Sequence, residues 1–250
     1  MTYGDLFAGI GGMSLGLERA GMECRFQVEI DPFCQKVLAK HWPHVRRYGD
    51  IRTVSELEPV DLIAGGFPCQ DISYAGRGEG IDGERSGLWS EMLRIIRLAR
   101  PRFVLVENVP ALLTRGLERV LGQLAEIGYD AEWSVLSACA LGAPHTRERL
   151  FVLAYAHGEF GQRWMVTPDR SPEAVARVPD QRGGHRQHAQ ARAEADSRLR
   201  SLAEWWRIEP GVGRMATGIP RRMDRLKSLG NAVVPQVAEW IGHRIMEAAA

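Results

Sequence analysis

Strand-like and helix-like stretches alternate through the first 154 residues, and this alternation constrains the fold more than any other feature. Apolar stretches typical of strands lie at 3–8, 24–29, 60–64, 103–107, 131–137 and 150–154, and stretches typical of helices at 13–20, 32–41, 90–99 and 117–127. Strands that alternate with helices of this length form right-handed βαβ units on a parallel sheet. We therefore expect an α/β fold with a Rossmann-like, doubly wound and mostly parallel sheet.

The pattern changes after residue 156, where the chain becomes rich in Arg, His, Gln, Ala and Pro and its apolar periodicity weakens. A helix pattern returns at 237–246. We predict that residues 1–156 and 228–250 form one domain, with the C-terminal helix folded back onto it. Residues 157–227 are predicted to form a small irregular region.

Composition narrows the class of protein. Hydrophobic residues make up 45% and charged residues 25% of the 250, and the formal net charge is +1, so any nucleic-acid binding must come from local patches. No apolar run approaches the roughly 18 residues of a membrane span. The cysteines have no zinc-like spacing and the N-terminus has no signal-peptide pattern, so we expect no metal site, no membrane and a cytoplasmic location.

A glycine turn follows the first predicted strand, in Asp5-Leu6-Phe7-Ala8-Gly9-Ile10-Gly11-Gly12. Such a turn lets a cofactor lie against bare backbone at a helix N-terminus. Glu29 ends the next strand 20 residues after Gly9, where a carboxylate can hold ribose hydroxyls. Ser14 replaces the third glycine of the dinucleotide pattern, and no phosphate-binding Lys-Ser/Thr follows. A nucleoside cofactor without a pyrophosphate, such as S-adenosylmethionine, therefore fits better than NAD.

Three further stretches place reactive side chains at strand ends. Cys69, in Gly65-Gly66-Phe67-Pro68-Cys69-Gln70, follows an apolar strand and is either a nucleophile or a buried structural thiol. Glu107 closes the strand at 103–107 and is either a general acid in the crevice or a helix-capping carboxylate. Arg147 and Arg149 would project to the same side of an extended stretch, to grip a phosphate or base, unless they form a solvated charge run.

Together these motifs resemble the cytosine-5 DNA methyltransferase family. Phe7–Gly12 resembles its cofactor motif, Gly66–Gln70 its nucleophile motif, Glu107-Asn108-Val109 its acid motif, and Arg147-Glu148-Arg149 the end of its Gln-x-Arg-x-Arg motif. Gly230-Asn231-Ala232-Val233-Val234-Pro235-Gln236 resembles its last motif. The motifs occur in the family's order, over residues 1–155 and 214–250. The fold that the resemblance implies is that of S-adenosylmethionine-dependent methyltransferases.

The resemblance implies a role for each residue type. Cys69 would add to C6 of a flipped-out cytosine, Glu107 would donate to N3, Arg149 would contact the base, and Arg147 would support the catalytic loop or a phosphate. Phe7 would pack on adenine, Glu29 would hold the ribose and Asp50 the adenine amino group. The full predicted cofactor site comprises Phe7, Gly9, Ile10, Gly11, Glu29, Ile30, Asp50, Ile51, Pro68, Leu88, Asn231 and Val233. The glycine-rich run 71–87 resembles the loop that closes over DNA.

The resemblance also sets partners and alternatives. Double-stranded DNA is the expected partner of a monomer in a bacterial or phage-infected cell, and a restriction enzyme partner is not readable from the chain. Two departures are His145 in place of the usual Gln, and an Arg-rich penultimate motif that is diverged at 218–227. Residues 157–213 are the candidate target-recognition region. The alternatives are a tRNA methyltransferase, whose Cys-Phe-Thr signature is absent, a non-catalytic DNA-binding regulator, and an NAD-dependent oxidoreductase.

Overall fold

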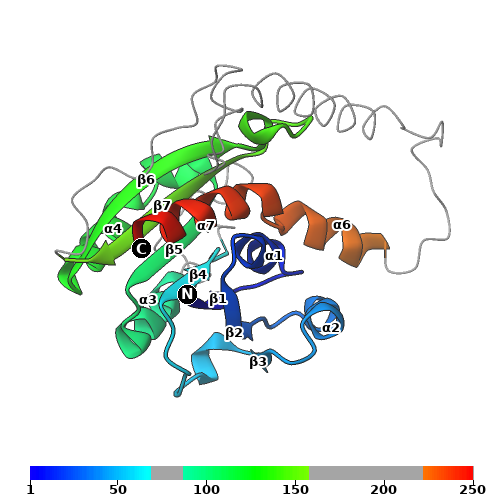
Figure 1. Cartoon of the computed structure of the whole chain (residues 1–250), viewed down its shortest axis with the longest axis horizontal. Helices are drawn as coiled ribbons and strands as arrows, with labels where there is room; N and C mark the ends of the chain where they lie inside the picture. Colours follow the sequence, from blue (N-terminus) through cyan, green and yellow to red (C-terminus); the bar gives the residue numbers. More distant parts are fainter. Residues whose placement is uncertain (69–86, 158–221, 250) are drawn as a thin grey trace, which may run out of the picture.

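The computed structural model describes residues 1–68, 87–157 and 222–249. The described residues form a seven-stranded sheet in the order β3-β2-β1-β4-β5-β7-β6 (Figure 1). Each neighbouring pair among β3, β2, β1, β4 and β5 is parallel, whereas β7 runs antiparallel to both β5 and β6. The strands are β1 (Thr2–Leu6), β2 (Glu23–Val28), β3 (Arg46–Tyr48), β4 (Leu62–Gly65), β5 (Phe103–Asn108), β6 (Tyr129–Ser137) and β7 (Glu148–Ala156). The expected α/β fold with a mostly parallel, doubly wound sheet is confirmed.

Helices cover both faces of this sheet. The described α-helices are α1 (Gly12–Arg19), α2 (Pro32–His41), α3 (Gly87–Ala99), α4 (Leu117–Glu126), α6 (Arg222–Asn231) and α7 (Pro235–Ala249). The short 3-10 helices are η1 (Ile51–Thr53), η4 (Pro110–Thr114) and η5 (Ala138–Leu141). Among these helices, none is long and apolar enough to cross a membrane.

The central strand β5 shows why the fold has two cores. Its side chains alternate between the faces, so Val104 and Val106 pack with α3 and α4, whereas Phe103 and Leu105 pack with α1 and α7. All six β5 residues are buried, as expected for a strand covered on both sides.

The C-terminal helix α7 packs closely on α1 (Figure 1). Small residues make this approach possible, because a Cβ on Gly16 would overlap Ala238 and the Pro235 carbonyl, and a Cβ on Gly242 would crowd Ala20. Immediately before α7, the Val233 carbonyl lies against Gly12 at the start of α1. A segment from the end of the chain is thereby held against the glycine turn at its beginning.

The structure corrects the sequence predictions at two elements. Strand β3 was not predicted, because its three residues, Arg46, Arg47 and Tyr48, form no apolar run and the strand forms by pairing with β2. Helix α6 was not predicted, because it has no strong apolar stripe. It runs across the predicted boundary between 227 and 228, and the division into two regions stays a prediction. Most of 157–227 lies outside the described residues, and so does the candidate target-recognition region apart from His157.

Candidate functional site

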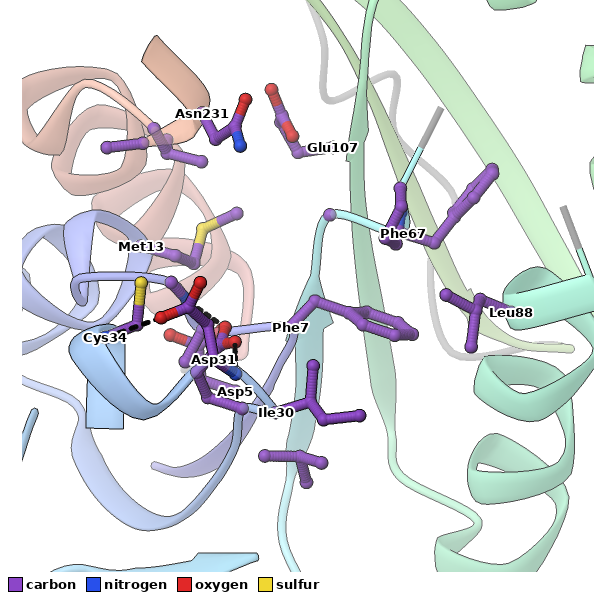
Figure 2. A pocket seen from close by; sticks show the side chains of 18 of the residues that line it. Asp5, Phe7, Met13, Ile30, Asp31, Cys34, Phe67, Leu88, Glu107 and Asn231 are labelled. Carbon is purple, nitrogen blue, oxygen red and sulfur yellow. Dashed lines mark hydrogen bonds between the residues drawn. The ribbon is translucent and has the colours of Figure 1, made fainter. Parts of the chain in front are cut away.

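A cavity of about 520 Å³ opens at the carboxyl ends of β1, β2, β4 and β5 (Figure 2). This is the edge of a doubly wound sheet where ligands bind. The chain returns to this edge at the end of α6, so that the cavity has walls from both ends of the sequence. The lining residues used below are Asp5, Phe7, Gly9, Glu29, Ile30, Asp31, Cys34, Asp50, Ile51, Gly66, Phe67, Pro68, Leu88, Glu107, Asn108, Arg149, Ser228, Gly230, Asn231, Ala232 and Val233.

The glycine turn brings backbone to the cavity. Gly9 and Gly11 have φ values of 56° and 86°, which L-residues rarely adopt. Phe7 has a φ of 57°, a strained value for a non-glycine residue, and its ring extends toward Leu88 in Figure 2. Of the predicted cofactor residues, Ile10 and Gly11 do not line the cavity. Gly11 instead lies under the Trp42 ring, where a Cβ would overlap the indole.

Glu29 braces the turn from the neighbouring strand. Its Oε2 accepts the Gly9 backbone N–H at 2.7 Å, and its Oε1 accepts the Asp31 N–H at 2.7 Å. Each carboxylate oxygen has a second lone pair for another donor, so Glu29 can also accept from a ligand hydroxyl. Asp31 in turn caps α2 by accepting the N–H groups of Phe33 and Cys34.

A second acidic residue enters from the segment after β3. Asp50 caps η1, accepting the Arg52 N–H at 3.0 Å, and lies next to Ile51 in the cavity wall. Arg94 of α3 holds this segment in place, because its guanidinium donates to the carbonyls of Ile51 and Val54 at 2.7 Å each. The predicted residues Asp50 and Ile51 are therefore fixed by a residue that sequence reasoning did not single out.

Glu107 lies at the opposite end of the cavity (Figure 2). The residue is only 8% exposed, and Arg149 Nε lies 3.0 Å from its Oε1. Burial raises the pKa of this carboxyl to about 7, because the loss of water outweighs the attraction of Arg149 and Arg147. Gly66 is needed here, since a Cβ at that position would overlap Glu107 Oε2. The site thus contains a carboxyl that is partly protonated at neutral pH.

The two arginines divide their contacts. Arg149 lines the cavity and pairs with Glu107, whereas Arg147 does not line it and donates to the carbonyls of Gly230 and Ala232. Both guanidiniums are near enough to Glu107 to lower its pKa. The pKa of Arg147 is lowered by burial and by Arg149, with Glu107 opposing the change.

The predicted nucleophile, Cys69, lies outside the described residues, as do residues 71–86 of the predicted loop. The chain is described up to Pro68, which lines the cavity, so the cysteine follows the cavity wall directly in sequence. Asn108 Nδ2 donates to the Phe67 carbonyl at 3.3 Å and so ties this loop to the end of β5. The acid strand and the segment that leads to the cysteine are therefore joined.

Several lining residues were missed by sequence reasoning. Asp5 is buried beneath the turn, and burial raises its pKa to about 7 although Ser14 Oγ donates to it at 2.6 Å. Its position before the glycine turn is a signal that could have identified it. Cys34 Sγ of α2 lies 3.5 Å from Ser228 Oγ of α6. Without a prediction of α6, nothing in the sequence pointed to that contact.

The acceptors and apolar surfaces around the cavity fit an adenosine-type ligand. Carboxylates at Glu29 and Asp50 suit hydroxyl and amino donors, and Phe7, Ile30 and Leu88 supply apolar and aromatic surface for a flat base. The carboxylates of Glu29, Asp31 and Asp50 favour a ligand with a positive charge over one with phosphates. A sulfonium nucleoside meets these requirements.

Comparisons with known proteins all point to DNA methyltransferases. The family model described as C-5 cytosine-specific DNA methylase matches residues 1–204. The chain is 40% identical over 162 residues to type II methyltransferase M2.BsuMI of Bacillus subtilis strain 168, covering 62% of the chain and 42% of that protein. It is 37% identical over 156 residues to type II methyltransferase M.HgiCII of Herpetosiphon aurantiacus, covering 60% and 36%. The chain spans about two fifths of the length of these curated relatives.

Solved structures show the same architecture. A putative DNA modification methyltransferase encoded within an E. coli prophage is similar with a TM-score of 0.54 and 27% identity, over 62% of this chain and 47% of that one. The Dnmt2 methyltransferase of S. pombe has a TM-score of 0.55 and 22% identity, over 66% and 53%, which is a likeness of fold alone.

Proposed function

Because the chain belongs to the C-5 cytosine-specific DNA methylase family, we propose that it transfers a methyl group from S-adenosylmethionine to C5 of cytosine in double-stranded DNA. The protein would act in the cytoplasm of a bacterial or phage-infected cell. Cys69 is the nucleophile, and Glu107 is the acid. The observation that carries the proposal is the buried Glu107, which has a pKa near 7 and lines the same cavity as the carboxylates of Glu29 and Asp50.

The cofactor would be held by the part of the cavity around the glycine turn. Phe7 would pack on the adenine, Glu29 would accept the ribose hydroxyls and Asp50 the adenine amino group. The twelve residues of the predicted cofactor site keep these roles, with Ile10 and Gly11 shaping the turn rather than lining the cavity. When bound, S-adenosylmethionine supplies the electrophilic methyl group.

Glu107 performs the acid step because its proton is available at neutral pH. A carboxyl with a pKa near the working pH is protonated often enough to donate and acidic enough to transfer its proton. Arg149 orients it through the 3.0 Å contact and lies beside it at the cavity, where it would contact the target base. This arrangement needs the base to leave the DNA stack, since the acid is buried at the end of β5.

The bond changes balance around cytosine. The Cys69 thiolate forms a bond to C6, the displaced electron pair moves to N3, and N3 takes the Glu107 proton. This makes C5 nucleophilic enough to bond to the methyl carbon of bound S-adenosylmethionine, whose methyl–sulfur bond would break with S-adenosylhomocysteine as the leaving group. A base then removes the C5 proton, the Cys69–C6 bond breaks with return of the thiolate, and N3 gives its proton back to Glu107. Aromaticity is restored and the enzyme is regenerated.

The choice of DNA target would come from residues 157–213. None of the family motifs falls in this region, and nine of its residues are arginines, which suit contacts to phosphates and guanine edges. We therefore assign target recognition to this region and the chemistry to the part of the chain that carries Cys69, Glu107 and Arg149.

The test is methyl transfer from labelled S-adenosylmethionine to bacterial genomic DNA of varied sequence. Cys69→Ser is expected to lose transfer while retaining cofactor binding. Cys139→Ser is the matched control, because Cys139 is exposed on η5 and does not line the cavity. Full transfer by the Cys69→Ser variant would refute the assigned nucleophile.

A further inference from the structure

Arg147 joins two parts of the chain that are far apart in sequence. Its Nη2 donates to the Gly230 carbonyl at 2.8 Å and to the Ala232 carbonyl at 2.6 Å. The nitrogen has two hydrogens, and each one serves one carbonyl. The start of β7 is thereby fastened to the turn between α6 and α7.

The two acceptors lie where a helix end needs donors. Helix α6 ends at Asn231, and the last carbonyls of a helix have no partners within it. The Ala232 N–H returns to the Ser228 carbonyl at 3.0 Å, which leaves the carbonyls beyond it for other donors. A guanidinium also places positive charge at the negative end of the helix dipole. Arg147 therefore completes the end of α6 from a different part of the fold.

The fastened turn is a wall of the cofactor cavity. Asn231 lies between the two acceptor residues and faces the cavity opposite Glu107 in Figure 2. Val233 follows, lines the same cavity, and its carbonyl packs against Gly12 of the glycine turn. Arg147 itself does not line the cavity, so its hydrogen bonds act on a bound cofactor through this wall.

We infer that Arg147 is a positioning residue that sets the Gly230–Val233 wall for the cofactor, while Arg149 serves the acid. This rests on the proposed function and gives Arg147 a different role from the loop or phosphate contact that the sequence suggested. Arg147 contacts the Gly230–Val233 wall and Arg149 contacts Glu107. Because the two arginines are only two residues apart, this short segment connects the cofactor wall to the acid.

The test uses the full chain and S-adenosylhomocysteine as the cofactor probe in isothermal titration, with methyl-transfer kinetics alongside. Arg147→Met is expected to raise the Kd of the probe and the KM of S-adenosylmethionine by about tenfold or more, as expected for lost charge-assisted hydrogen bonds. The KM for DNA is expected to change by less than about twofold, since phosphate contacts are not removed. Arg147→Lys keeps the charge and is expected to recover part of the affinity.

Arg97→Met is the control, an exposed arginine on α3 that does not line the cavity. Arg147→Met protein that binds the probe like wild type but binds DNA weakly would overturn the inference and leave the proposed function standing. If Arg147→Met fails to fold, the same comparison is made with Arg147→Gln, which is neutral and shorter, and wild-type probe affinity in that variant also overturns the inference. Wild-type protein that binds no probe overturns the proposed function itself, and the inference with it.

Discussion

Replacing Glu107 with glutamine should change how the stability of the protein depends on pH. Burial raises the pKa of Glu107 from its ordinary 4.5 to about 7 in the folded state. Between these two values the folded protein keeps a proton that the unfolded chain has released. Stability from the neutral carboxyl is therefore complete below about pH 4.5 and is lost as the pH rises to about 7. Glutamine has nearly the shape of the neutral acid but does not ionise in this pH range.

The size of the effect follows from the shift. Each pH unit in this window costs about 1.4 kcal/mol for one group, so raising the pH from about 5 to above 7 costs about 2.7 kcal/mol through Glu107. Asp5 is also buried, with its pKa raised to about 7, and loses stability in the same window. Both proteins contain Asp5, so its contribution cancels in the difference between them.

The assay is urea denaturation of wild type and Glu107→Gln at about pH 5 and about pH 7.5. The free energy of unfolding of Glu107→Gln should rise relative to wild type by about 2–3 kcal/mol between the two conditions. Glu118→Gln serves as the control, because Glu118 is exposed on α4. Stability curves of Glu107→Gln and wild type that stay parallel would show that the buried carboxyl is ionised throughout, and would refute the reasoning.

Three further results are expected. The kcat of methyl transfer should fall about tenfold per pH unit above about pH 7, as Glu107 loses its proton, in steady-state assays across pH. Arg94→Met removes donors to the backbone at Ile51 and should raise the Kd of S-adenosylhomocysteine about tenfold in titrations. Gly12→Ala places a methyl group against the Val233 carbonyl and should lower the free energy of unfolding by about 1–3 kcal/mol in urea.

Each result has a clear counter-outcome. A flat pH profile of kcat would remove Glu107 as the acid. Unchanged cofactor affinity in Arg94→Met would show that η1 keeps its position without that contact. Wild-type stability in Gly12→Ala would mean that the wall before α7 yields easily, which would also weaken the argument for a fixed cofactor wall. Arg97→Met again controls for loss of a positive charge on α3.

Local signals predicted much of the fold. Helix α2 has the predicted bounds, 32–41, because Asp31 caps its first turn and Pro32 starts it. The other predicted elements match the observed ones to within a few residues, since buried strands such as β5 are continuously apolar. Strand β3 and helix α6 could not be found in this way, because β3 depends on a partner strand and α6 has an exposed, polar surface.

The candidate site shows the same division. Phe7, Glu29 and Glu107 were predicted from their positions at strand ends, and all three line one cavity. They meet there because the carboxyl ends of parallel strands lie at the same edge of the sheet. The separate partners of Arg147 and Arg149 could not be predicted, because Arg147 meets residues 83 and 85 positions away. Only the folded arrangement of α6 and α7 decides that contact.

The most direct measurement of the central claim is covalent trapping on DNA that contains 5-fluorocytosine. Fluorine at C5 cannot leave as a proton does, so an enzyme that has added Cys69 to C6 and methylated C5 stays bound. The account predicts a denaturation-resistant protein–DNA complex that needs S-adenosylmethionine and is absent from Cys69→Ser. A folded wild-type protein that binds cofactor and methylates ordinary DNA, yet forms no such complex, would contradict the covalent mechanism.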